Sequence, residues 1–149
     1  MEHEEYMRQA LELARLAMAE GEVPVGCVIV RDGAVVGRGR NRRETAQTAL
    51  GHAELEAIAQ ACRTLGGWRL AGCALYVTLE PCPMCAGAIV NARIPAVYYG
   101  AKDDKAGCCG SVLNLFEERY GHHPAIYGGV LADDCADVLR AFFSGLRET

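Results

Sequence analysis

Two short segments of the sequence carry side chains that together can do chemistry. The first is His52-Ala53-Glu54, and the second is Pro81-Cys82-Pro83-Met84-Cys85. Because Cys82 and Cys85 are three positions apart, their thiols would share one face at the start of a helix, where the helix dipole favours their ionised form. Two thiolates and one imidazole form a donor set that suits zinc. The spacing therefore predicts a zinc site with three protein ligands.

Three protein ligands leave the fourth position of a tetrahedral zinc site to water, as in catalytic zinc sites. Two thiolates offset the charge of the ion, so it acidifies water less than an all-histidine site does, and a nearby base becomes necessary. Glu54, two residues after His52, is the candidate for that base.

Two other interpretations of the cysteine pair stay open. The spacing Cys-x-x-Cys also occurs in redox dithiols, and by itself it does not separate a redox pair from a metal site, although the nearby His52-x-Glu54 favours the metal. A structural zinc would need a fourth protein ligand. The candidates for such a ligand are Cys108, Cys109, His122 and His123.

The segments that must position these residues alternate between helical and extended patterns. Apolar spacing predicts helices over residues 2–20, 53–65, 82–92 and 133–147, and β-prone runs predict strands over 26–30, 34–37, 73–79, 96–100 and 125–128. A further short helix is expected before the last strand. Asp32-Gly33 suits a tight hairpin turn between the first two strands.

This order of elements predicts an α/β fold with a mixed, largely parallel sheet that carries helices on both faces. In such sheets ligands collect at the carboxyl ends of the strands, where helix N-termini point. Since His52 opens the second helix and Cys82 opens the third, we expect both helix starts to face one cavity.

Length and composition indicate a single globular domain over residues 1–149. Hydrophobic residues at 51% and charged residues at 23% exclude disordered, collagen-like and coiled-coil classes. The 15 basic and 19 acidic residues give a formal net charge of −4, which argues against a sequence-blind nucleic-acid binder but leaves a local basic patch open.

The sequence also predicts a cytoplasmic protein with no membrane partner. No apolar run approaches the roughly 18 residues of a membrane span, and the first residues are acidic where a secretory signal would be basic. The eight cysteines are therefore expected to be reduced thiols rather than a disulfide framework.

The pairing of His-x-Glu with Pro-Cys-x-x-Cys resembles the zinc-dependent cytidine/deoxycytidylate deaminase superfamily. Within it, the chain is similar nearly end to end to the bacterial tRNA-specific adenosine deaminases. The segments that carry this resemblance are Val23-Pro24-Val25-Gly26, Asn41, Gly51-His52-Ala53-Glu54, residues 75–89, residues 99–103, Lys105, Gly107, Gly110-Ser111, residues 129–135 and Phe142-Phe143.

The resemblance implies a three-layer α/β/α cytidine-deaminase-like fold with a central mixed sheet of five strands. It implies hydrolytic deamination of adenosine to inosine at the wobble position of a tRNA anticodon, with a flipped-out base and a water molecule activated by zinc. It implies one zinc ion per chain on His52, Cys82 and Cys85, with Glu54 as the proton shuttle.

The resemblance further implies a homodimer bound to a tRNA anticodon stem-loop. The substrate-binding residues that it implies are Pro24, Val25, Asn41, Lys105 and His122. Two positions depart from the family pattern: Gly121 stands where asparagine is usual, and Cys108-Cys109 replace a pair of small residues.

Several surface features have both a structural and an RNA-binding interpretation. The candidate phosphate contacts are Arg38, Arg40, Arg42, Arg43, Lys102 and Lys105, although a solvated strand edge explains the arginines equally well. For Phe142 and Phe143 we expect packing of the last helix against the sheet rather than stacking on an anticodon base, and for Trp68 a loop anchor.

Two rival functions remain from the sequence alone. A deaminase of a free base or nucleotide, of the guanine or cytosine type, would use the same zinc chemistry. A non-catalytic, zinc-stabilised RNA-binding module would keep the metal but not the turnover. Substrate specificity separates the first from a tRNA deaminase, and the effect of replacing Glu54 separates the second.

Overall fold

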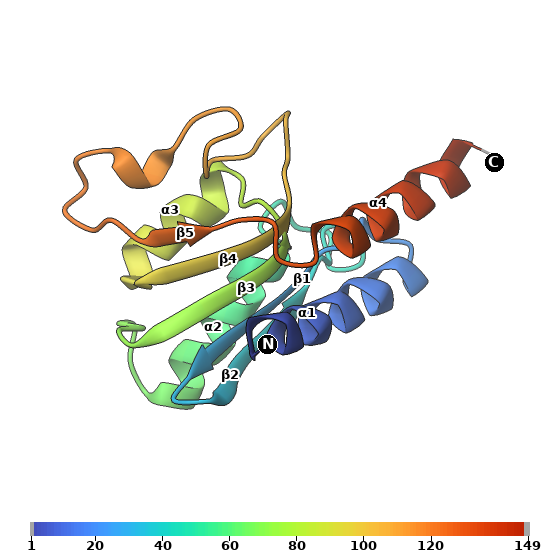
Figure 1. The fold of residues 1–149 in the computed structure, drawn as a ribbon. Helices are drawn as coiled ribbons and strands as arrows, with labels where there is room; N and C mark the ends of the chain where they lie inside the picture. The colour runs from blue at the N-terminus through green and yellow to red at the C-terminus, as the bar shows by residue number, and fades with distance from the viewer. Residues whose placement is uncertain (1, 148–149) are drawn as a thin grey trace.

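The chain alternates helices and strands in the predicted order (Figure 1). The computed structural model describes residues 2–147. Its helices are α1 (Glu2–Ala19), α2 (Ala53–Leu65), α3 (Pro83–Ala92) and α4 (Ala132–Arg147), and its strands are β1 (Gly26–Arg31), β2 (Ala34–Arg40), β3 (Cys73–Leu79), β4 (Ala96–Ala101) and β5 (Ala125–Tyr127). The expected short helix before the last strand is a single 3₁₀ turn, η1 (Leu115–Glu117).

The five strands form one mixed sheet in the order β2-β1-β3-β4-β5. The strand β1 is antiparallel to both of its neighbours, whereas β3, β4 and β5 are parallel to one another. The prediction of a mixed five-stranded sheet is confirmed. The antiparallel share is larger than expected because β1, rather than β2, pairs with β3.

A two-residue turn connects the first two strands as predicted. Asp32 and Gly33 have φ values of 51° and 78°, so both adopt the left-handed conformation of a type I′ hairpin turn. At the C-terminal end of α2, Gly66 is the cap residue and has a φ of 75°. Local turn chemistry therefore fixes the hairpin and the end of α2.

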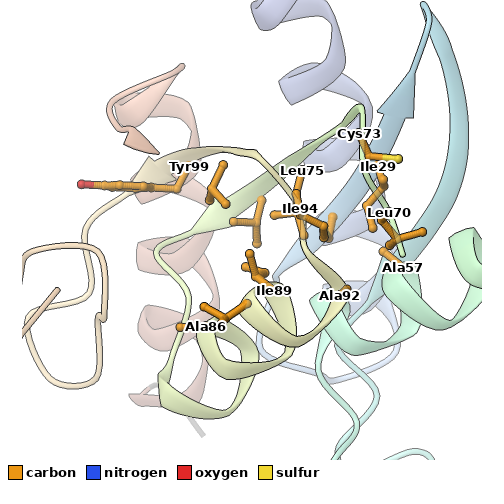
Figure 2. Packing of buried hydrophobic residues seen from close by; sticks show 14 of the residues in the cluster. Ile29, Ala57, Leu70, Cys73, Leu75, Ala86, Ile89, Ala92, Ile94 and Tyr99 are labelled. Atoms are coloured by element: carbon orange, nitrogen blue, oxygen red, sulfur yellow. The ribbon is translucent and has the colours of Figure 1, made fainter. Parts of the chain in front are cut away.

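Helices cover both faces of the sheet, so the molecule has three layers. Alternate side chains of β1 enter different cores: Cys27 and Ile29 pack with α2 and α3, whereas Val28 and Val30 pack with α1. Figure 2 shows the core beneath α2 and α3. This arrangement confirms the expected α/β/α layering.

The helix α2 lies unusually close to β2. A Cβ atom on Gly39 would be 2.1 Å from the carbonyl oxygen of Ala53, and one on Gly37 would be 2.3 Å from that of Ala57. Only glycine permits this approach. The two glycines therefore set the position of the first turn of α2, which carries Glu54.

The packing predicted for Phe143 is wrong. Only the first half of α4 packs on the sheet, through residues such as Cys135, and the helix then extends past it (Figure 1). Phe143 is consequently 46% exposed and contacts Phe142 edge-on. Trp68 is 55% exposed, and its ring lies 4.8 Å from the guanidinium of Arg69 and 5.8 Å from that of Arg93, the C-cap residue of α3.

Within residues 2–147, none of the helices combines the length and the apolar character needed to cross a lipid bilayer.

Candidate active site

Three segments that follow strands meet at one edge of the sheet. The strands β2 and β3 are both antiparallel to β1, and β4 is parallel to β3, so all three end at the same edge. His52 and Cys82 are the N-cap residues of α2 and α3, and both border one cavity at this edge. The two helix starts thus share a cavity, as the sequence predicts.

The imidazole of His52 faces both thiols. Its Nδ1 atom is 3.6 Å from Cys82 Sγ and 3.5 Å from Cys85 Sγ, and the three ligand atoms all lie within 4.8 Å of one another. Around a tetrahedral zinc ion with ordinary bond lengths, a nitrogen and a sulfur ligand are separated by about 3.6 Å. The observed distances match that separation, so these three side chains can hold a metal ion.

The closed four-ligand alternative finds no support in the part of the chain that the structure describes. The group of metal-binding side chains found there contains His52, Cys82 and Cys85 and no fourth ligand. His123 instead makes a 2.6 Å contact with the carbonyl oxygen of Phe116. The geometry therefore favours an open site over a structural one.

The thiols are prepared for metal binding. A hydrogen bond with Cys85, reinforced by His52, lowers the pKa of Cys82 to about 4, and the same contact raises the pKa of Cys85. The hydrogen bond to Cys82 also raises the pKa of His52. Binding of a metal ion by both sulfurs would require both thiols to be deprotonated.

Glu54 lies in the first turn of α2, next to the metal-binding group. Its side chain is only 4% exposed and borders the cavity. Burial raises the pKa of this carboxyl to about 7. A carboxyl group with a pKa near neutrality can accept and donate a proton at ordinary pH, as a general acid-base catalyst must.

The cavity has a volume of about 240 Å³, which is below the roughly 300–1,000 Å³ of pockets that hold drug-sized ligands. Its size suits one nucleobase. The residues that border it come from five parts of the chain and are Val23, Val25, Asn41, Arg43, His52, Ala53, Glu54, Leu79, Glu80, Cys82, Asp103 and Ala106.

The predicted substrate-binding residues divide into two groups. Val25 and Asn41 border the cavity, and Pro24 is buried between two bordering residues. Lys105 and His122 do not border it. The imidazole of His122 contacts the carbonyl oxygen of Ile94, just before β4 and thus at the opposite edge of the sheet. Contacts of these two residues with RNA stay a prediction.

The candidate phosphate contacts also divide. The guanidinium of Arg40 binds the carboxylate of Glu20 at 2.8 and 3.2 Å, and Arg42 Nε lies 2.7 Å from Glu56 Oε2. Arg43 borders the cavity and forms no ion pair within residues 2–147. Arg43 is therefore better placed than Arg40 or Arg42 to meet a phosphate.

The two departures from the family pattern are compatible with the fold. Gly121 has a φ of 80°, in the left-handed region that asparagine tolerates better than most residues. Cys108 and Cys109 are both buried, which accounts for small side chains at these positions. Cys108 and Cys109 do not belong to the metal-binding group, although the N–H of Cys108 donates to the carbonyl of Pro81, next to Cys82.

Sequence reasoning missed two buried acidic residues, one of which borders the cavity. Glu22 is 1% exposed and Glu80 is 2% exposed, and Glu80 borders the cavity. The available signal was position: Glu22 directly precedes Val23-Pro24-Val25, and Glu80 directly follows the apolar strand that ends at Leu79, although glutamate as a residue type is rarely buried.

The chain matches known deaminases along most of its length. It matches the MafB19-like deaminase family over residues 1–147. It is 49% identical to the tRNA-specific adenosine deaminase of Bacillus subtilis (strain 168) over 144 residues, which make up 96% of this chain and 89% of that protein.

Two solved structures are similar to it. One, from a study of A-to-I editing by tRNA:A34 deaminases at the wobble position of transfer RNA, has a TM-score of 0.87 and 45% identity and covers 91% of this chain and 99% of its own. The other, a guanine deaminase from Bacillus subtilis, has a TM-score of 0.67 and 34% identity and covers 100% and 96%.

The higher identity and the closer structural match both lie with the tRNA deaminases. They extend over nearly all of both chains, so they cover the helix starts that carry His52 and Cys82 as well as the scaffold behind them. This chain is a deaminase, and it belongs to the family of tRNA-specific adenosine deaminases.

Proposed function

We propose that this protein hydrolyses the adenosine at the wobble position of a tRNA anticodon to inosine. The observation that carries the proposal is the three-ligand group beside the buried Glu54, in a cavity of one-base size. The relative from Bacillus subtilis, at 49% identity, supports tRNA as the carrier of that base.

We assign His52, Cys82 and Cys85 as the ligands of one zinc ion per chain. The donor set of one nitrogen and two sulfurs and the separations of 3.5 and 3.6 Å support zinc. When bound, zinc would supply an activated water molecule for the attack. The protein residues around it then hold the base and move the protons.

Glu54 is the proton shuttle of this proposal. Its carboxylate takes a proton from the water that attacks the six-position carbon of adenine and delivers it to the neighbouring ring nitrogen. A second transfer through the same carboxyl group protonates the amino group, so ammonia leaves and the carbonyl group of inosine forms. Water and adenosine are thus converted to inosine and ammonia.

Asn41 is fixed in an orientation that suits a base or ribose contact. Its Oδ1 accepts a hydrogen bond from the backbone N–H of Arg43 at 3.2 Å, and its Nδ2 donates one to the carbonyl of Val23 at 3.2 Å. One further N–H of the amide and one acceptor site remain for a substrate. These contacts support Asn41 as a substrate-binding residue.

The proposed assembly is a homodimer that binds an anticodon stem-loop in the cytoplasm. The surface beside α3 supports an interface between subunits: Leu115 and Tyr120 border a depression next to Gly87, and Tyr120 is 62% exposed. Sedimentation of the purified protein at micromolar concentration would show a dimer, and a monomer would contradict this part of the proposal.

The decisive experiment measures inosine in an anticodon stem-loop that contains a wobble adenosine, with zinc quantified in the same sample. We expect product from protein with one zinc per chain. Zinc-loaded protein that makes no inosine would overturn the proposal.

The 34% identity to a guanine deaminase favours one alternative, a deaminase of free bases. Release of ammonia from free guanine or cytosine, without conversion of the stem-loop, would support this alternative.

A zinc-stabilised RNA-binding module is tested by a different comparison. Replacing Glu54, as Glu54→Ala, should abolish turnover while zinc content and RNA binding are kept. A module would show no turnover in the wild type either.

A further inference from the structure

Two carboxylates lie buried beneath two of the chain segments that line the cavity, one after β2 and one after β4. The segment 41–51 supplies Asn41 and Arg43 to the cavity, and the segment 102–111 supplies Asp103 and Ala106. Glu22 underlies the first segment and Glu80 the second. Neither carboxylate belongs to the metal-binding group.

Glu80 binds three successive parts of the segment 102–111. Its Oε1 accepts hydrogen bonds from the backbone N–H of Asp103 at 3.1 Å and from the hydroxyl of Ser111. Its Oε2 accepts bonds from the N–H groups of Cys109 at 2.8 Å and Ser111 at 3.1 Å. These donors use about four acceptor sites, which is the capacity of a carboxylate, so none remains for a substrate.

A glycine brings this segment onto the carboxylate. A Cβ atom on Gly107 would lie 2.3 Å from Glu80 Cδ and 2.5 Å from Oε1. Any larger residue would push the segment away from Glu80. The close approach is independent evidence that the segment is shaped around this carboxylate.

Glu22 binds the segment 41–51, the other wall of the cavity, in the same way. Its two oxygens accept hydrogen bonds from the backbone N–H of Glu44 at 3.1 Å, and from the backbone N–H and hydroxyl of Thr45. The backbone of Glu22 is itself tied to α1, because its N–H donates to the carbonyl of Ala17 at 2.9 Å. The segment 41–51 is thus anchored to α1 through one side chain.

No cation neutralises either carboxylate within the described residues, since neither forms an ion pair there. An ionised side chain is costly to bury, and packing alone would be served better by an apolar one. What each charged carboxylate adds is a set of hydrogen bonds from the backbone N–H groups of its segment.

We propose that Glu22 and Glu80 are positioning residues, which hold the two cavity walls at the separation that accepts a single base. This inference rests on the proposed deamination. Because the walls contact the base rather than the reacting atoms, the held geometry contributes equally to binding in the ground state and in the transition state.

The test uses Glu22→Gln and Glu80→Gln in the zinc-loaded full chain, with the exposed Glu12→Gln on α1 as the control. Glutamine turns one acceptor oxygen into an NH₂ group that faces N–H donors. For each of the two variants we expect KM for the stem-loop to rise about tenfold or more while kcat and zinc content stay near wild type. The control should match the wild type.

Amide hydrogen exchange gives a readout that does not depend on activity. Glu80→Gln should accelerate exchange at Asp103, Cys109 and Ser111, and Glu22→Gln should accelerate it at Glu44 and Thr45, each without an effect on the other wall. A wild type that makes no inosine would overturn the proposed function, while the exchange data would still decide the role of the carboxylates.

Gentler variants cover the case in which a glutamine variant fails to fold. Ser111→Ala and Thr45→Ala each remove one hydroxyl donor and keep the charge, so they should give the same pattern to a smaller degree. Gly107→Ala should reproduce the effect of Glu80→Gln, whereas Gly67→Ala, where a Cβ meets nothing within 4 Å, should not. Unchanged KM and exchange, or a loss confined to kcat or zinc, would overturn the proposal.

Discussion

At the scale of single residues, what distinguishes two of the eight cysteines is the neighbour that they face. All eight are free thiols, and most are buried. Cys82 and Cys85 face His52 at a helix start, whereas Cys62 packs against the core and lies 3.9 Å from the carbonyl oxygen of Trp68. Metal binding therefore follows from position in the fold and not from residue type.

Replacing Cys85 should remove the metal ion, and replacing Cys62 should not. In Cys85→Ala only two ligands remain, so we expect zinc to fall well below one per chain and inosine formation to be lost. Metal analysis after dialysis measures the stoichiometry. Cys62→Ala is the matched control, and equal zinc in both variants would contradict the ligand assignment.

Two neighbouring arginines should differ in their contribution to RNA binding. Arg43 borders the cavity without an ion pair in residues 2–147, whereas Arg40 is held by Glu20. We expect Arg43→Ala to weaken binding of the stem-loop and to lower its salt dependence by about one phosphate contact. Arg40→Ala should leave both nearly unchanged. Titrations at several salt concentrations test this, and an identical effect of the two variants would refute it.

At the scale of elements, the contact between β2 and α2 connects the scaffold to the chemistry. A methyl group on Gly39 would overlap the carbonyl of Ala53, one residue before Glu54. Gly39→Ala should therefore displace the start of α2, destabilise the protein by about 1–3 kcal/mol and reduce turnover. Thermal unfolding and stem-loop kinetics measure the two effects. Gly67→Ala, in open space, should change neither.

Gly37 and Gly39 also explain the end of β2, which sequence patterns did not predict. The second strand was expected over residues 34–37, but β2 continues to Arg40. Its last residues alternate glycine with arginine and lack the apolar side chains that mark a strand. They form a strand because they pair with β1 and because Gly37 and Gly39 allow α2 to pack closely on β2. Both causes involve residues distant in sequence, so no local pattern shows them.

At the scale of the whole molecule, acid stability should depend on Glu22. Burial opposes its ionisation, but hydrogen bonds from Thr45 and Glu44 outweigh burial and place its pKa below the ordinary value of 4.5. A lowered pKa in the folded state adds stability above the ordinary pKa, and that stability is lost as the pH falls through the folded pKa.

The difference in unfolding free energy between wild type and Glu22→Gln should thus be largest near pH 7 and should shrink below about pH 4.5. Urea unfolding of both proteins over this pH range measures it. A difference that grows on acidification would contradict the assigned direction. Comparing the two proteins at each pH removes the effect of metal loss, which they share.

The sequence predicted the parts of the molecule that depend on local patterns. The helix starts at His52 and Cys82, the hairpin turn and the layered sheet follow from spacing and turn chemistry. The roles of Glu22 and Glu80 did not, because each carboxylate binds donors about 20 to 30 positions away. The exposure of Phe143 was also missed, since no pattern shows how far α4 extends past the sheet.

The hairpin turn at Asp32-Gly33 is a place where a label or a domain can be attached far from the cavity. Arg31 pairs with Cys73 at the start of β3, whereas the metal-binding group follows the end of that strand. A seven-residue strand, roughly 20 Å long, therefore separates Asp32-Gly33 from the cavity. A fluorescent label or a fused domain inserted between these two residues would report on the protein, or recruit it elsewhere, while the opposite edge continued to edit RNA.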